Sequence, residues 1–209
     1  MKLRLALFGS LAVFLICLPA VAQVDLYDNG PTDGNTDAWT FNFGFTPSHS
    51  FNLANPAQVS GLQFAAWLTV GDVLQSVEIA ITSSELGGTT YFDQVVTTTQ
   101  SGCAVNQYGF DVCNESAMFN GPSLNVGTYW VTLQNGVVNT GDPVYWDENS
   151  GPSSASETSL GTIPSESFTV LGSTGSTSTT GTTPEPSTLM MVGSGALGFL
   201  GILRRKSSR

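Results

Sequence analysis

The chain has 209 residues and a formal net charge of −10 at pH 7. All six Lys and Arg residues lie at the two ends of the chain, and none occurs between residues 23 and 183. The same segment holds fifteen of the sixteen Asp and Glu residues, and the exception is Glu185. A segment without fixed cations cannot neutralise phosphates, so this composition excludes nucleic-acid binding and nucleotide-phosphate sites. Anionic membranes and acidic polysaccharides would be repelled unless divalent cations bridge the two surfaces.

Residues 1–22 have the pattern of a secretory signal peptide. Lys2 and Arg4 precede an apolar run over residues 5–18, and the small side chains of Ala20 and Ala22 fit a signal peptidase. We predict that signal peptidase cleaves after Ala22. Lipidation of Cys17 is the alternative, and it is disfavoured because Ile16 occupies a position where a lipoprotein signal has a small residue.

Residues 23–171 are predicted to form one all-β domain, a β-sandwich or a jelly-roll-like fold. A polar entry segment reaches Ala38, and residues 39–45 then alternate aromatic with small or polar side chains as far as Pro47. Because no amphipathic helical pattern separates the strands, the segment favours a sandwich. The further predicted strands are 62–70, 74–81, 89–99, 127–133, 144–146 and 166–171.

Two residue types with reactive side chains are scarce in the predicted domain. Cys103 and Cys113 are its only cysteines, and export to an oxidising compartment predicts a disulfide between them. His49 is the only histidine, which excludes a structural zinc site. Its neighbours Ser48 and Ser50 are polar, and we expect a surface-loop histidine without a catalytic role.

Carboxylates suggest two further sites. Asp33, Asn35 and Asp37 place oxygen ligands at alternate positions, which makes them a candidate calcium site, although Ala38 and Gly44 depart from the EF-hand pattern. Asp147 and Glu148 invite comparison with a glycoside hydrolase. Adjacent strand residues point to opposite faces, however, so these two cannot flank a bond by themselves. We expect no enzymatic activity and no bound cofactor apart from this calcium candidate.

Paired aromatic residues give the best indication of a binding surface. In Tyr129-Trp130 and Tyr145-Trp146 the pleat sends one ring inward and the other outward. Trp130 and Trp146 are therefore candidates for a platform on which sugar rings stack, with solvent-shielded core positions as the alternative.

The C-terminal part has a linker and a tail. Residues 172–183 contain only Gly, Ser and Thr, which predicts a flexible tether. The tail, residues 184–209, contains Pro184, Glu185 and Pro186, an apolar run predicted as a transmembrane helix over 189–203, and the basic residues Arg204, Arg205 and Lys206. This tail resembles the PEP-CTERM sorting signal. The resemblance implies recognition and cleavage by an exosortase, with transient membrane anchoring before transfer to the cell surface or the extracellular space.

The ends therefore predict the route of the protein better than its role. Our first hypothesis is a non-catalytic cell-surface or extracellular-matrix protein. The alternatives are a carbohydrate-binding module associated with extracellular polysaccharide and, third, a secreted glycoside hydrolase.

Overall fold

The computed structural model describes residues 23–174, and this part of the chain contains strands and no helix. The all-β prediction is confirmed, in the form of a large antiparallel sheet. The fourteen strands are β1 (Val24–Asp28), β2 (Ala38–Thr40), β3 (Pro47–Leu53), β4 (Ala57–Thr69), β5 (Leu74–Ser84), β6 (Gly87–Val105), β7 (Phe110–Met118), β8 (Ser123–Leu124), β9 (Gly127–Val138), β10 (Tyr145–Asn149), β11 (Ala155–Glu157), β12 (Gly161–Ile163), β13 (Ser165–Glu166) and β14 (Phe168–Thr174).

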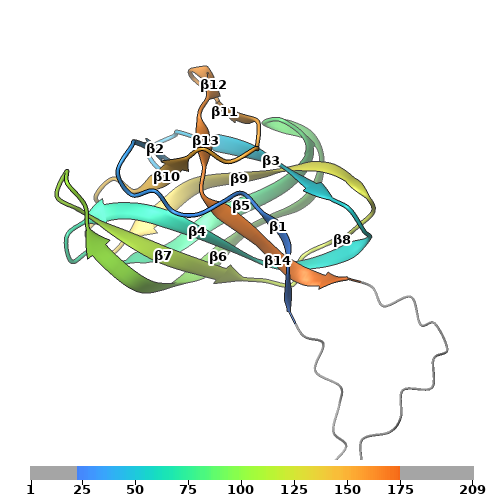
Figure 1. Cartoon of the computed structure of the whole chain (residues 1–209), viewed down its shortest axis with the longest axis horizontal. Coiled ribbons are helices and arrows are strands. Elements are labelled where there is room, and N and C mark those ends of the chain that lie inside the picture. Colours follow the sequence, from blue (N-terminus) through green and yellow to red (C-terminus); the bar gives the residue numbers. More distant parts are fainter. Residues whose placement is uncertain (1–22, 175–209) are drawn as a thin grey trace, which may run out of the picture. The chain divides into compact units, whose positions relative to one another are not determined.

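The order of hydrogen-bonded neighbours is β1-β14-β4-β7-β6-β5-β9-β3-β11-β12. The long strand β6 joins two layers, because its first part pairs with β5 and its last part, from Thr98 onward, pairs with β7. We call β1, β14, β4 and β7 the β4 layer, and β5, β9 and β3 the β9 layer. Figure 1 shows β3 and β9 above β4, β7 and β14.

The two layers face each other across one apolar core. Residues far apart in the strand order meet there: the His49 ring on β3 lies 5.8 Å from that of Phe168 on β14, and Phe51 lies 6.3 Å from Tyr27 on β1. Core side chains alternate along each strand, as Tyr129, Val131 and Leu133 do on β9. Because this core and all fourteen strands lie within residues 23–174, that segment has what an independently folding domain needs.

The predicted strand over residues 39–45 is wrong beyond Thr40. Strand β2 ends there, and a turn follows in which the Phe45 amide donates to the Asn42 carbonyl. Phe43, at φ +55°, is 66% exposed. The alternating aromatics have the pattern of a strand, but Asn42 and Gly44 favour a turn. The chain therefore forms a turn here.

The structure also contains strands where we expected loops. Strand β1 lies in the polar entry segment, and β14 includes residues 172–174 of the predicted linker. Strand β7 lies between the predicted strands 89–99 and 127–133, where we expected none. Cys103 on β6 and Cys113 on β7 form the predicted disulfide. It ties two neighbouring strands beside a register shift between Ser101 and Ala104.

The predicted processing segments lie outside the described residues, namely the signal peptide with Ala20 and Ala22, the rest of the linker, and the tail with its helix 189–203. Within residues 23–174, no helix is long and apolar enough to cross a membrane.

Candidate functional site

The outward face of the β4 layer carries a row of hydrogen-bonding side chains. Cross-strand pairing places Asp28, Thr169, Gln63, Ser116 and Thr99 side by side on β1, β14, β4, β7 and β6. Thr169, Gln63 and Ser116 alternate with buried residues, so the pleat directs their side chains away from the core. Asp28 and Thr99 are exposed. Five consecutive strands therefore present polar groups to solvent in one line.

A neighbouring row has the same character. Ala65 on β4, Asn114 on β7 and Ser101 on β6 are paired across the strands. Apart from Thr99, the two rows form the floor of a groove with a volume of about 540 Å³. A second hollow of about 310 Å³ shares Thr32 and Asn114 with it.

The wall of the groove is the loop of residues 29–37, which connects β1 with β2 (blue in Figure 1). Asp147 on β10 holds this loop from below: its carboxylate accepts hydrogen bonds from the amides of Asp33 and Gly34, both at 2.8 Å. It also accepts from the Trp67 indole at 2.6 Å and the Ser167 hydroxyl at 3.3 Å. Burial raises the pKa of Asp147, and these four donors oppose that shift.

Two further contacts fix the shape of the loop. Gly34 has φ +69°, and a Cβ there would lie 3.5 Å from the Val112 side chain, so the loop backbone approaches β7 closely. The side-chain amide of Gln107, on the loop between β6 and β7, donates to the Asn35 carbonyl at 2.9 Å. The wall is thus set before any ligand arrives.

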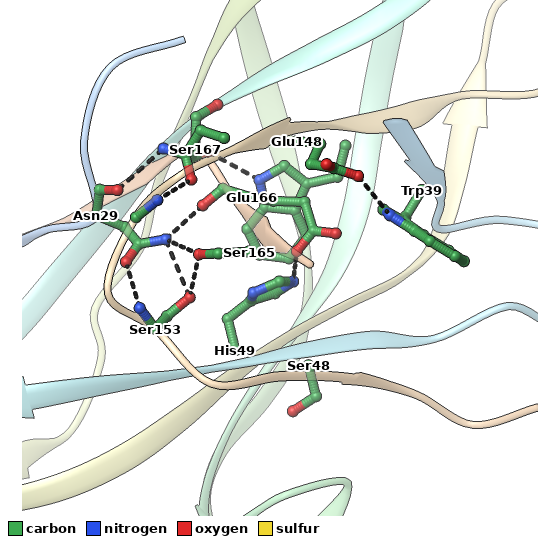
Figure 2. Close-up of polar contacts among 12 residues, drawn as sticks. Asn29, Trp39, Ser48, His49, Glu148, Ser153, Ser165, Glu166 and Ser167 are labelled. Carbon is green, nitrogen blue, oxygen red and sulfur yellow. Dashed lines mark hydrogen bonds and ion pairs between the residues drawn. The ribbon is translucent and has the colours of Figure 1, made fainter. Parts of the chain in front are cut away.

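Asn29 anchors the start of the loop, and Figure 2 shows its contacts. Its buried side-chain amide donates to the Ser165 hydroxyl at 2.7 Å and to the Glu166 carbonyl at 2.6 Å. Its side-chain oxygen accepts from the Ser153 amide at 3.0 Å and from the Tyr27 hydroxyl at 2.8 Å. Asn29 therefore connects the loop to segments more than a hundred residues away.

The groove presents one carboxylate, that of Asp28. Glu115 also lies at the groove, but it alternates with Asn114 and Ser116 and is 1% exposed, on the core side together with Cys113 and Ala117. Burial raises the pKa of Glu115 to about 7. Among the described residues that line the groove, Asp28 is therefore the one carboxylate presented to solvent.

The expected surface-loop position of His49 is wrong. His49 lies in β3 and is completely buried, because Pro47 begins this strand instead of ending the preceding one. Proline tolerates the first position of a strand. His49, Phe51 and Leu53 alternate toward the core, and this period of two was the signal that sequence reasoning missed.

His49 Nε2 contacts the carboxyl group of Glu166 inside the core (Figure 2). Burial lowers the pKa of His49 to about 3, and burial together with the nearby charges of Glu148 and Asp147 raises that of Glu166 to about 10. Both shifts favour a neutral pair in which the protonated Glu166 donates to the imidazole. Neither side chain is exposed, so the pair contributes to packing and is closed to a substrate.

The two candidate platform tryptophans have different surroundings. Trp146 is fully buried, with its indole donating to the Ser167 carbonyl at 2.8 Å, so its place in a platform is a wrong prediction. Trp130 is half-buried and faces outward from β9 between Ser50 on β3 and Thr82 on β5. Among the exposed aromatics, Phe43 and Phe45 share the turn after β2, whereas Tyr91 lies on β6 and Tyr108 on the loop between β6 and β7.

The candidate calcium ligands make hydrogen bonds inside the loop, and the calcium site stays a prediction. Asp33 uses its carboxylate inside the loop, accepting from the Asn35 amide and the Thr36 hydroxyl at 2.9 Å each, and the Asp37 carboxylate accepts from the Ala38 amide. Among residues 23–174, no three His, Cys, Asp or Glu residues are grouped to hold a metal ion. Glu148 accepts from the Trp39 indole at 3.3 Å.

The comparisons with known proteins assign the C-terminal tail alone. Residues 182–206 match the PEP-CTERM protein-sorting motif, and no curated protein matches the chain. The match covers the segment that contains Pro184, Glu185, Pro186, Arg204 and Arg205. The chain therefore carries the sorting signal of an exported protein that an exosortase processes at the cell surface.

Proposed function

We propose that this protein is a non-catalytic cell-surface or matrix protein, whose β-sandwich domain binds a neutral polysaccharide in the groove beneath the loop 29–37. The row of side chains across five strands carries the proposal. Hydroxyl and amide groups both donate and accept hydrogen bonds, so they match the hydroxyl groups of a sugar.

Charge supports a neutral ligand. Residues 23–174 contain no Lys or Arg, so an acidic polymer would find no cation in the groove and would meet the carboxylate of Asp28. A neutral chain avoids this repulsion. The sorting motif adds that the domain is delivered to the cell surface, where extracellular polysaccharides lie.

Preorganisation also supports binding. The wall is held by Asp147 and Asn29, so a ligand does not have to order the loop and loses less affinity to conformational entropy. A groove with a fixed wall and a flat polar floor suits an extended chain better than a compact ligand.

The test is binding of residues 23–174 to dextran, a soluble β-1,3-glucan and galactomannan, with alginate as an anionic comparator, each with and without calcium. We expect binding to at least one neutral polysaccharide and about tenfold weaker binding after Gln63→Ala plus Asn114→Ala. Gln94→Ala, an exposed glutamine on β6 outside the groove, is the matched control. Equal binding by all three proteins, or binding to alginate alone, would refute the proposal.

A further inference from the structure

Trp130 differs from the other tryptophans in its hydrogen bonding. The indole N–H groups of Trp39, Trp67 and Trp146 donate to Glu148, Asp147 and the Ser167 carbonyl. Within the described residues, that of Trp130 makes no hydrogen bond although its ring is only half-buried. An indole with an open N–H combines an apolar face with a free donor, and both are available to a ligand.

The residues beside Trp130 are small and carry hydroxyl groups. Its cross-strand partners are Thr82 on β5 and Ser50 on β3, and the exposed Ser154 lies next, since its amide donates to the Ser50 hydroxyl at 2.8 Å. No larger side chain is in register with the ring. Neighbouring strands are about 4.8 Å apart, so a chain lying across β3 and β9 meets the Ser50 hydroxyl and the indole. Thr82 is 6% exposed and donates its hydroxyl to the Ser84 carbonyl.

Trp130 points away from the groove. Tyr129 and Val131 face the core on either side of it, so Trp130 is on the outer face of the β9 layer. The groove is on the outer face of the β4 layer, where Gln63 alternates with the core residues Leu62 and Phe64. The core separates the two surfaces, and one ligand segment cannot cover both.

We propose that Trp130, with Ser50 and Ser154, forms a second polysaccharide site, and that one domain thereby bridges two polysaccharide chains. The sugar ring stacks on the indole, whose N–H donates to a sugar hydroxyl. The bridging role rests on the proposed function of the groove, whereas the Trp130 site itself depends only on the β9 layer. A single domain then acts as a cross-link in an extracellular matrix.

The experiment compares four forms of residues 23–174: wild type, Trp130→Ala, Trp130→Phe, and the groove variant with Gln63→Ala plus Asn114→Ala. Each is mixed with the neutral polysaccharide that wild type binds best, and both binding and light scattering are recorded. Wild type should raise the scattering by forming cross-links. Trp130→Ala and the groove variant should each still bind but fail to raise it, and Trp130→Phe should retain part of the effect because it keeps a ring.

Trp39→Phe is the matched control, because Trp39 is also half-buried but donates its N–H internally. It should cross-link like wild type. Undiminished cross-linking by Trp130→Ala would overturn the inference, and so would self-association of wild type through Trp130 without polysaccharide, seen by sedimentation. If the groove variant loses all binding while Trp130→Ala loses none, the groove function stands and this inference fails. Absence of binding by wild type refutes both proposals.

Discussion

The two outer faces of the domain are built in different ways from the same kind of strand. The β4 layer has a floor of amides and hydroxyls and becomes concave only because the loop 29–37 stands beside it, held by Asp147. On the β9 layer the distinguishing residue is Trp130, placed by strand register alone. The first surface therefore depends on the buried side chains of Asp147 and Asn29, which hold the loop, whereas the second depends on strand pairing that many backbone hydrogen bonds maintain.

The substitution Asp147→Ala should distinguish the binding functions of the two faces most clearly. This substitution leaves the buried donors of Trp67, Asp33 and Gly34 without an acceptor, so we expect the free energy of unfolding to fall by about 2–4 kcal/mol. Denaturant unfolding measures the loss. Groove binding should disappear while stacking on Trp130 persists. Asp25→Ala, which removes an exposed carboxylate, should change neither quantity.

Removal of the disulfide should have the next largest effect. Cys103 and Cys113 are separated by ten residues, and replacing both with Ala should cost about 2–3 kcal/mol on the chain-entropy estimate. A reducing agent should destabilise wild type by a similar amount and leave the double variant unchanged. The bond joins β6 to β7 next to Ser101 and Asn114, so groove binding should weaken more than binding at Trp130.

The buried titratable groups lie between the two outer faces, so a change of pH should alter the stability of the whole domain and affect both faces alike. Burial raises the pKa of Glu166 to about 10 and that of Glu115 to about 7. Their contribution to the free energy of unfolding is therefore complete below about pH 4.5, and it is lost as pH rises through these folded-state pKa values. His49 has its pKa lowered to about 3, so its contribution grows between pH 3 and 6.5. Their sum predicts greatest stability near pH 5 and a decline toward pH 9.

The slope of that decline should be at most about 1.4 kcal/mol per pH unit for each proton released. Thermal unfolding between pH 4 and 9 measures it. Glu166→Gln keeps a donor for His49 and removes the titration, so it should flatten the curve above pH 7. A wild-type curve that rises steadily from pH 5 to 9 would contradict the neutral buried pair.

Trp130→Ala should have the smallest effect on stability, about 1–2 kcal/mol, because Trp130 is only partly buried and no hydrogen bond is lost. A much larger loss of the free energy of unfolding, measured with denaturant, would show that Trp130 contributes mainly to packing and is not available to a ligand. Trp146→Ala is the contrasting case, because Trp146 is completely buried and contacts His49 and Phe168.

Sequence patterns predicted the strands whose inward residues are uniformly apolar, such as Val77, Ile79 and Ile81 on β5. They failed where a polar residue faces the core, as His49 does on β3, because the pattern then resembles a loop. The disulfide was predictable from a count of two cysteines. The groove was not, since its row of Thr169, Gln63 and Ser116 comes from separate strands and becomes a line only through their register.

Strand β14 has a consequence for the order of assembly. It is the last strand before the sorting motif, yet it lies inside the sheet, hydrogen-bonded to β1 on one side and to β4 on the other. A chain that leaves the cell N-terminus first delivers this strand last, so the apolar interior stays open until translocation is nearly complete. We therefore expect the sheet to close between β1 and β4 only after nearly the whole domain has been exported.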